Sequence, residues 1–465
     1  MRGKKNRAFI VAGTGSGVGK TVVALGVMEA LRKRGYLVQP FKSGPDYIDP
    51  GHHRALLKRP SYNLDTWMMG VEGVKKTFRE KAEGVSVIEG AMGLFDGRDG
   101  RSEEGSAAHL SKVLKLPVLL VVDAQKMARS AGAIVRGFET FDPEVDLRWV
   151  VFNRVGSPRH SRMLKDSLPK GTKVKVIGCL PMDSALSMPE RHLGLVTHGD
   201  LQKGRWGRLV KRAAALMEKH LDLAPLAGPA PAGGRRKATA SPIKRAGRSR
   251  PIVKIAVALD GAFCFYYEEN LEMLKSFGAE IEYFSPMRDM SLPEGIGGLY
   301  LGGGYPELHA EALEANSALR EEIRAGAKMG MPIFAECGGL MYLGRSIEVT
   351  PGERYSMAGV FSWRARMLRK RKALGYREVT VVRDCPLSKE GGVVRGHEFH
   401  YSSIPAPLPG LKRTFTFFNG NEEVREGYLY KNTLATYVHL HFSSNPAMAS
   451  GFVDTCAAFE RGSGA

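Results

Sequence analysis

The chain has 465 residues, of which 43% are hydrophobic and 25% are charged, a composition typical of a soluble globular protein with more than one domain. No apolar run approaches the ~18 residues that suggest a membrane-spanning helix, so we expect no membrane partner. Its 68 Lys and Arg residues outnumber its 48 Asp and Glu residues, and the net charge of +20 fits either nucleic acid or an anionic small substrate.

The cysteines favour a reducing compartment. The chain has five cysteines: Cys179, Cys264, Cys337, Cys385 and Cys456. Their number is odd and no two of them form a C-x-x-C pair, which argues against a disulfide framework or a zinc site. We therefore expect a cytoplasmic protein. The basic N-terminus is followed by only a short apolar run, so we expect no cleavable signal.

Residues 8–31 predict a phosphate-binding loop. An apolar strand at 8–12 leads into glycines, then Lys20 and Thr21, then a helix at 22–31. Glycines let the backbone wrap an anion, and the helix N-terminus offers free N–H groups. Lys20 would neutralise the β and γ phosphates of a nucleotide, and the Thr21 hydroxyl would ligate Mg²⁺. We expect ATP contacts from Gly13, Thr14, Gly15, Gly17, Val18, Gly19, Lys20 and Thr21.

The first half of the chain alternates short apolar runs with helical segments. Near-continuous apolar strands of this kind predict a parallel sheet covered by helices on both faces. Ligands of such sheets lie at the carboxyl ends of the strands. After the first strand, the expected strands are 36–42, 85–88, 116–122, 147–152 and 174–178.

Polar residues follow three of these runs. Asp46 and Asp49 lie in a Gly- and Pro-braced loop and would hold Mg²⁺ or position a nucleophile, although such aspartates are more often turn residues. Glu89 ends a buried run and fits a carboxylate on the metal side of the phosphate loop. Asn153 would read a nucleobase edge or belong to a plain turn.

Residues 223–251 predict a linker between a domain at 1–222 and a domain at 252–465. The stretch is rich in Pro, Gly and Ala and continues with basic residues but no acidic ones. Aromatic residues for base stacking are absent from it, which favours a linker over a nucleic-acid arm. Its basic residues are Arg235, Arg236, Lys237, Lys244, Arg245, Arg248 and Arg250.

The second domain predicts a cysteine nucleophile. Cys337 follows an apolar run at 332–336 and precedes two glycines, which is the pattern of a nucleophile elbow with sulfur in place of oxygen. The N-terminus of the following helix would lower the pKa of the thiol. His439 on a late strand is a candidate base, and Gly303 and Gly304 offer N–H groups for an oxyanion hole.

The two halves together indicate an amide-forming synthetase, in which one domain releases ammonia from glutamine and the other uses ATP to activate a carboxylate. On its motifs, the chain resembles the glutamine-dependent cobyrinate a,c-diamide synthase family of corrin biosynthesis. The matching stretches are 13–21, 41–50, 89–97, 301–307, 335–343, 396–402 and 437–442.

The resemblance implies an α/β protein of two domains, a P-loop domain like dethiobiotin synthetase and a domain like class I glutamine amidotransferases. It implies ATP-dependent amidation of the a and c carboxylates of cobyrinate through acyl phosphates, with glutamine or ammonia as nitrogen donor. It places Thr21, Asp46 and Glu89 on the Mg²⁺ side and Asp49 near the activated carboxylate. Cys337 becomes the nucleophile, with His439 as its base.

A tetrapyrrole that carries many carboxylates would also account for the basic chain. The segment 396–402 is expected to face this substrate. A run of cations would face it too or form a solvated strand edge: Arg364, Arg366, Arg369, Lys370, Arg371 and Lys372. The expected substrate contacts are Tyr47, His397, His400 and Tyr401.

Two departures from the family pattern and several alternatives stay open. Leu259, near the start of the second domain, stands where a basic residue is expected. His441 stands where class I glutaminases usually have a glutamate, which favours a Cys–His dyad over a triad. An enzyme of the same architecture would also amidate hydrogenobyrinate or Ni-sirohydrochlorin, and both remain alternative substrates. A DNA-binding partition-type ATPase is a different reading, but Thr14 and Gly15 stand where such proteins usually carry a second lysine, so no nucleic-acid partner is expected. The sequence is compatible with an oligomer, but it determines neither the oligomeric state nor the order of the two amidations.

Overall fold

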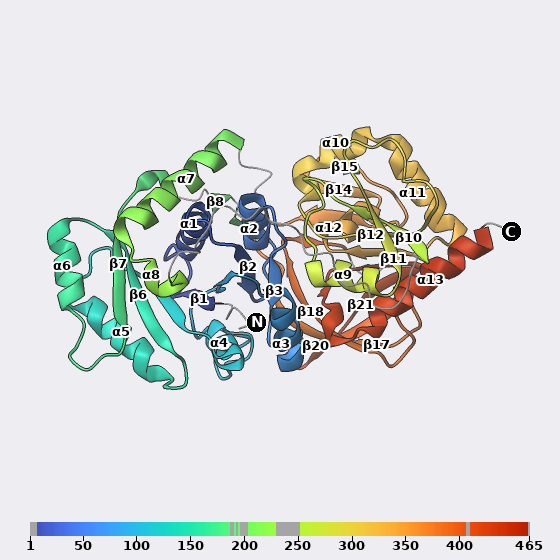
Figure 1. Cartoon of the computed structure of the whole chain (residues 1–465). Helices are drawn as coiled ribbons and strands as arrows, with labels where there is room; N and C mark the ends of the chain where they lie inside the picture. Colours follow the sequence, from blue (N-terminus) through green and yellow to red (C-terminus); the bar gives the residue numbers. More distant parts are fainter. Residues whose placement is uncertain are drawn as a thin grey trace. The chain divides into compact units, whose positions relative to one another are not determined.

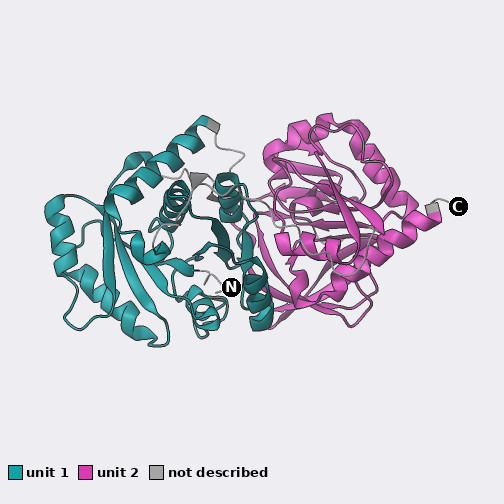
Figure 2. Ribbon diagram, viewed as in Figure 1, with its two compact units in different colours: residues 1–242 teal, residues 243–465 magenta. Residues whose placement is uncertain are grey.

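The computed structural model describes residues 7–186, 190–191, 194–195, 203–228, 252–405 and 410–463. The chain divides into two compact units, residues 1–242 and 243–465 (Figures 1 and 2). Each unit combines helices with a large sheet, which confirms the predicted α/β class. The expected boundaries at 222 and 252 fall close to this division and stay a prediction.

The first unit is built on a seven-stranded parallel sheet with β1 at its centre. The strand order is β3-β2-β4-β1-β5-β6-β7, and β1 pairs with β4 through Phe9↔Val87 and with β5 through Val11↔Leu119. The strands are β1 (Arg7–Gly13), β2 (Val38–Ser43), β3 (Tyr62–Leu64), β4 (Val85–Glu89), β5 (Val118–Asp123), β6 (Leu147–Val155) and β7 (Lys175–Pro181).

Helices bury both faces of this sheet, as the apolar strands predict. Because successive side chains of a strand point to opposite faces, Ile10 and Ala12 of β1 enter one core and Phe9 and Val11 enter the other. The first core contains residues of α3 (Gly70–Lys81), α4 (Ala107–Leu114), α5 (Ser130–Phe141) and α6 (Pro158–Asp166). The second contains residues of α1 (Lys20–Lys33), α7 (Lys203–His220) and α8 (Ala224–Ala227). Helix α2 (Ile48–Leu57) follows β2.

Two features of the first unit were not foreseen from the sequence. The short strand β3 extends the sheet beyond β2, where it pairs through Phe41↔Tyr62. The start of the expected linker forms α8, and Leu223 and Leu226 are buried in the second core. Residues 229–251, which hold the basic residues of that linker, lie outside the described residues.

The second unit has a ten-stranded mixed sheet in the order β11-β10-β12-β13-β22-β21-β20-β17-β18-β23. The first five strands are mutually parallel, and the remaining pairs are antiparallel. In that order the bounds are β11 (Ala279–Phe284), β10 (Val253–Ala258), β12 (Ile296–Leu301), β13 (Ile333–Glu336), β22 (Thr433–Thr436), β21 (Glu422–Tyr430), β20 (Lys412–Asn419), β17 (Ala373–Val381), β18 (Val393–His400) and β23 (His439–Leu440).

A smaller sheet and a set of α-helices complete the described part of the second unit (Figure 1). The smaller sheet has the order β15 (Glu353–Ser356), β14 (Ser346–Thr350), β16 (Arg364–Met367) and β19 (Ser402–Ser403). The helices are α9 (Glu268–Ser276), α10 (Ala310–Ala315), α11 (Ser317–Met329), α12 (Gly338–Leu343) and α13 (Ala447–Ser463). Among the helices that the structure describes, none is long and apolar enough to cross a membrane.

Candidate active sites

The predicted phosphate-binding loop connects β1 to α1, and two residues of β6 hold it in place. Gly19 precedes α1 with φ 97°, a left-handed conformation that favours glycine, and a Cβ there would lie 2.3 Å from Asn153 Nδ2. Asn153 Nδ2 donates a hydrogen bond to Val18 O at 2.9 Å, and an Arg154 guanidinium nitrogen donates to Gly17 O at 2.9 Å. The Asn153 amide therefore braces the loop, and its expected contact with a base stays a prediction.

Lys20 and Thr21 open α1 in two different environments. Lys20 Nζ donates to Gly15 O at 2.8 Å, so the side chain folds back over the loop. Burial lowers the pKa of Lys20, and the nearby charge of Lys42 lowers it further. The Thr21 hydroxyl donates to Glu89 Oε1 at 2.7 Å, which joins the loop to the carboxyl end of β4.

Lys42 lies among three carboxylates at the carboxyl end of β2. Its Nζ is 2.5 Å from Asp49 Oδ2, 3.5 Å from Asp46 Oδ2 and 3.6 Å from Glu89 Oε1. Burial opposes a charge on Lys42, but the carboxylates outweigh burial and raise its pKa. His53 completes the cluster, with Nε2 2.8 Å from Glu89 Oε2.

The two loop aspartates differ in their contacts. Asp49 Oδ1 is 3.5 Å from the Thr21 hydroxyl, so Asp49 reaches the start of α1 as well as Lys42. Asp46 Oδ1 accepts the Ile48 N–H at 2.9 Å. Burial and the charge of Asp49 raise the pKa of Asp46 to about 7. Asp49 therefore lies beside Thr21, and the expected place of Asp46 on the Mg²⁺ side stays a prediction.

The residues of the first site fit Mg²⁺ bound together with a nucleotide. Across the described residues no group of three or more His, Cys, Asp or Glu is placed to hold a metal ion by itself. Mg²⁺ usually takes one or two carboxylates, phosphate oxygens and waters, so a complete protein cage is not needed. Thr21 Oγ1 and Glu89 Oε1, 2.7 Å apart with Asp49 nearby, supply the hard oxygen atoms that this ion prefers.

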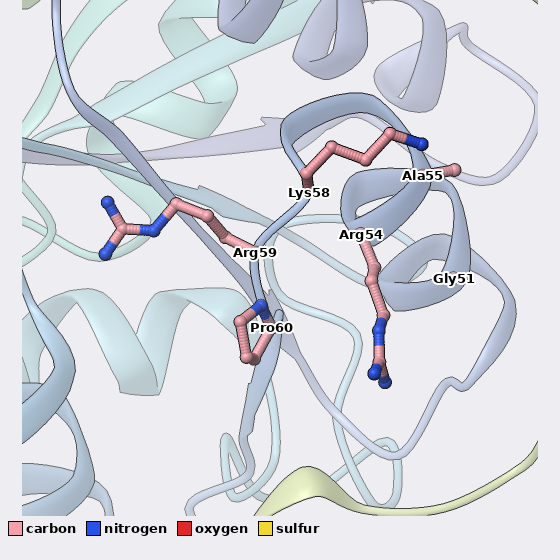
Figure 3. A pocket seen from close by; sticks show the side chains of 6 residues that line it. All are labelled: Gly51, Arg54, Ala55, Lys58, Arg59 and Pro60. Carbon is pink, nitrogen blue, oxygen red and sulfur yellow. The ribbon is translucent and has the colours of Figure 1, made fainter. Parts of the chain in front are cut away.

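A basic pocket lies on the exposed face of α2, the helix whose first turn carries Asp49 (Figure 3). Its volume is about 450 Å³. Arg59 forms an ion pair with Glu83 at 2.7 Å. Arg54 and Lys58 bring two further cations to the lining of this hollow, which favours an anionic group as its occupant. The pocket is lined by Gly51, Arg54, Ala55, Lys58, Arg59 and Pro60.

In the second unit, Cys337 forms the predicted sharp turn between β13 and α12. It has φ 47° and ψ −96°, which is unusual for a residue other than glycine, and its N–H donates to Thr436 O at 2.7 Å. The thiol is buried, with Sγ 4.0 Å from Phe399 O. Burial raises the pKa of Cys337, and the nearby Glu307 and Glu398 raise it further. The expected lowering of this pKa is wrong, because burial dominates at the start of the six-residue helix α12.

Three chain segments meet around this turn. A Cβ on Gly338 would lie 3.0 Å from Gly304 N, so the start of α12 packs on the glycine loop after β12. A Cβ on Gly303 would lie only 2.4 Å from His439 Cε1, so the imidazole packs directly on that loop. The structure thus brings the predicted nucleophile, base and oxyanion-hole residues into one region: Cys337, His439, Gly303 and Gly304.

The comparisons with known proteins match both halves of the chain. Residues 9–196 match the CobQ/CobB/MinD/ParA nucleotide binding domain, and residues 254–447 match the CobB/CobQ-like glutamine amidotransferase domain. A cobyrinate a,c-diamide synthase of Caldanaerobacter subterraneus subsp. tengcongensis is 41% identical over 98% of this chain and 99% of its own. Synthases of the same name from Syntrophotalea carbinolica and Priestia megaterium are 43% and 40% identical, over 96% and 98% of this chain and 98% of each relative.

The chain belongs to the cobyrinate a,c-diamide synthase family. The resemblance inferred from the motifs is therefore confirmed, and so is the class of enzyme, a ligase of the glutamine amidotransferase type. The nucleotide-binding and amidotransferase domains imply ATP and glutamine as substrates.

Around His439, this member of the cobyrinate a,c-diamide synthase family has a buried polar network. His439 pairs with His397 across β23 and β18, and burial together with His397 lowers the pKa of His439 to about 3. Burial and the Arg377 charge lower the pKa of His397 to about 4. His400 bonds Glu398 Oε1 through Nε2 at 2.9 Å and Ser402 O through Nδ1 at 2.8 Å. The imidazole of His439 is therefore neutral at pH 7, as a general base requires.

His441 does not replace the missing glutamate electrostatically. It is fully buried, its Nδ1 accepts the Ser443 N–H at 3.3 Å, and its ring centroid is 4.6 Å from that of Tyr267. Burial lowers the pKa of His441 to about 3, so it carries no charge at pH 7 and cannot stabilise an imidazolium as a carboxylate does. This supports the interpretation of a Cys–His dyad.

Lys42, His53 and Arg154 contact the first site but were not singled out as site residues from the sequence. The sequence held a signal for two of them: Lys42 is near the carboxyl end of β2, and His53 follows Asp49 by four residues on the same face of α2. The remaining expected substrate contacts, Tyr47 and Tyr401, are partly exposed beside these sites and stay predictions.

We expect Lys42→Met to destabilise the first unit by about 3 kcal/mol, because it leaves buried carboxylates without their cation. Lys75→Met is the matched control, since Lys75 forms an exposed pair with Glu72 and its removal has little effect. Chemical denaturation of both variants checks this. Equal stability of the two variants would show that Lys42 is not the counterion of the cluster.

We expect Gly303→Ala to lower glutamine hydrolysis about 100-fold, because the added Cβ displaces His439 from the thiol. Gly462→Ala is the control in the same unit, since a Cβ there meets no atom within 4 Å. Steady-state release of glutamate is the measurement. Full activity of Gly303→Ala would place the base elsewhere.

Proposed function

We propose that this enzyme amidates the a and c side-chain carboxylates of cobyrinate, using ATP and taking nitrogen from glutamine or ammonia. The observation that carries the proposal is that one chain combines a phosphate-binding loop beside buried carboxylates with a cysteine turn beside a neutral histidine. The printed names of the relatives support the choice of cobyrinate. Hydrogenobyrinate and Ni-sirohydrochlorin are the alternatives with the same chemistry.

In the second unit, Cys337 acts as the nucleophile toward glutamine. His439 accepts the thiol proton, and the sulfur attacks the side-chain amide carbon. The N–H groups of Gly303 and Gly304 stabilise the oxyanion that forms. The imidazolium returns its proton to the leaving nitrogen, so that ammonia departs and a thioester remains. Water then hydrolyses the thioester to glutamate and restores the thiol.

In the first unit, the phosphate-binding loop orients the γ-phosphoryl group toward a carboxylate of the acceptor. Transfer gives an acyl phosphate and ADP, and ammonia then displaces phosphate to give the amide. Bound Mg²⁺, held by Thr21 and Glu89, would supply positive charge to the phosphate oxygens. Lys20 and Lys42 bring two further positive charges to this region, while Asp49 lies next to Lys42 on the acceptor side.

A polycarboxylate acceptor also fits the distribution of exposed cations. The basic pocket on α2 is one such place. The basic loop, residues 369–372, is a second: all four of its residues are exposed, and in the part of the chain that the structure describes none pairs with an acidic side chain. Leu368 N donates to Tyr401 O and Lys372 N donates to His400 O, so the loop is anchored on the segment expected to contact the substrate.

We expect Cys337→Ala to abolish amidation driven by glutamine and to leave amidation driven by ammonia intact, because only the second unit needs the thiol. Purified enzyme is incubated with ATP, Mg²⁺, either nitrogen source and each candidate tetrapyrrole, and the masses of the products are measured by mass spectrometry. Each exchange of a carboxylate for an amide lowers the mass by about one unit. Loss of both activities in the variant, or no ADP and no glutamate from the unmodified enzyme, would overturn the proposal.

We expect the double variant Arg369→Glu and Arg371→Glu to raise KM for the tetrapyrrole about tenfold, because the basic loop would then repel carboxylates. Glutamate substitutions at Lys275 and Lys328, two exposed cations of the same unit, are the matched control. The difference should shrink as salt is added. An unchanged KM would assign the basic loop to the solvated surface.

A further inference from the structure

Strand β23, which carries His439, is an edge strand of only two residues. Among the residues that the structure describes, it pairs only with β18, through Gly396↔Leu440 and His397↔His439. His441 N also donates toward β18, to Arg395 O at 2.9 Å. Since backbone groups alternate in direction along a strand, the N–H and C=O of Leu440 point to the side where no strand follows. Such groups need partners when they are buried.

Two buried side chains take the place of the missing strand. Glu336 Oε1 accepts the Leu440 N–H at 2.8 Å. Asn270 Nδ2 donates to Leu440 O at 2.7 Å, and Asn270 Oδ1 accepts the Phe442 N–H at 2.8 Å. The backbone on both sides of His441, and the residue that directly follows His439, are thereby fixed by side chains from other segments of the unit.

Glu336 links this strand to the nucleophile. It ends β13, is 1% exposed and immediately precedes Cys337. Its second oxygen, Oε2, accepts the hydroxyl of the fully buried Tyr300 at 2.8 Å, which fixes the carboxyl group in one orientation. Within the described residues no Lys or Arg forms an ion pair with it. One hydrogen bond therefore connects the two reactive residues: Glu336, next to Cys337 in the chain, accepts it from the N–H of Leu440, which is next to His439.

We propose that Glu336 is a positioning residue of the glutaminase site, which sets the separation of the Cys337 thiol and the His439 imidazole by bonding the peptide N–H next to His439. The inference rests on the proposed glutaminase step. Glu336 differs from the glutamate of a class I triad, because it bonds the backbone beside the histidine, while His441 occupies the triad position. A displacement of about 1 Å between catalytic groups can cost roughly 100-fold in rate, so this hydrogen bond matters for catalysis.

The alternative role for Glu336 is direct proton transfer. Burial raises the pKa of Glu336 to about 8, whereas the hydrogen bonds from Tyr300 and Leu440 N–H oppose that rise. A carboxyl group that titrates near neutral pH next to a nucleophile is a candidate acid or base. The two roles predict different behaviour for the isosteric amide, which keeps the acceptor oxygen but has no titratable proton.

The test compares Glu336→Gln, Glu336→Leu and Tyr300→Phe in the full chain. In Glu336→Gln the amide oxygen accepts the Leu440 N–H, so kcat for glutamine hydrolysis should stay within about threefold of the unmodified enzyme with an unchanged pH profile. Glu336→Leu should lower kcat about 100-fold with little change in KM for glutamine. Tyr300→Phe removes only the second hydrogen bond, so its loss in kcat should be intermediate.

Ammonia-driven amidation and thermal unfolding serve as controls for folding, and both should remain near normal in Glu336→Gln. Inactivity of Glu336→Gln, or a shifted pH profile in that variant, would contradict the positioning role of Glu336 and support direct proton transfer. Full activity of Glu336→Leu would remove Glu336 from the mechanism altogether. Failure of the unmodified enzyme to release glutamate from glutamine would instead refute the proposed glutaminase step, so the two failures are distinguishable.

Discussion

Both candidate sites depend on the same constraint, that a chain leaving a parallel strand must turn at the carboxyl end of that strand. There the backbone is no longer paired on both sides, so polar side chains and unusual backbone conformations gather at one edge of the sheet. In the first unit the ends of β1, β2 and β4 bring the phosphate-binding loop, Lys42 and Glu89 together. In the second unit the ends of β12 and β13 bring the glycine loop and Cys337 together.

The two sites solve the problem of burial in opposite ways. The first site keeps its charges and pairs them, since the ammonium of Lys42 lies within 3.6 Å of three carboxylates. The second site keeps its reactive groups neutral, because burial raises the pKa of the Cys337 thiol and lowers that of His439. Charge pairing suits a site that receives a nucleotide anion, whereas a neutral thiol and imidazole suit the attack on an uncharged amide.

The sequence predicted the parts of each site that follow from local pattern. Lys20 and Thr21 were recognisable because glycines, lysine and threonine have fixed spacing, and Cys337 because a strand and two glycines flank it. Lys42 and Glu336 were missed as site residues, since their roles depend on partners 7 to 104 residues away, Asp49 and Leu440. Four strands of the ten-stranded sheet, β17, β18, β20 and β21, were also not foreseen, because these antiparallel strands follow no spacing motif and are fixed only by their pairing.

In the proposed glutaminase step, the neutral state of the second site affects when ammonia is released. Proton transfer from the Cys337 thiol to His439 costs free energy when both groups are buried and uncharged. That cost can be offset only by interactions that form along the reaction, above all the hydrogen bonds from the Gly303 and Gly304 amides to the developing oxyanion. These interactions require glutamine in place with its carbonyl directed at the glycine loop. A fixed separation of thiol and imidazole therefore controls the reaction better here than a permanently ionised pair would. It keeps the nucleophile inert until a substrate carbonyl is aligned with the thiol and the imidazole.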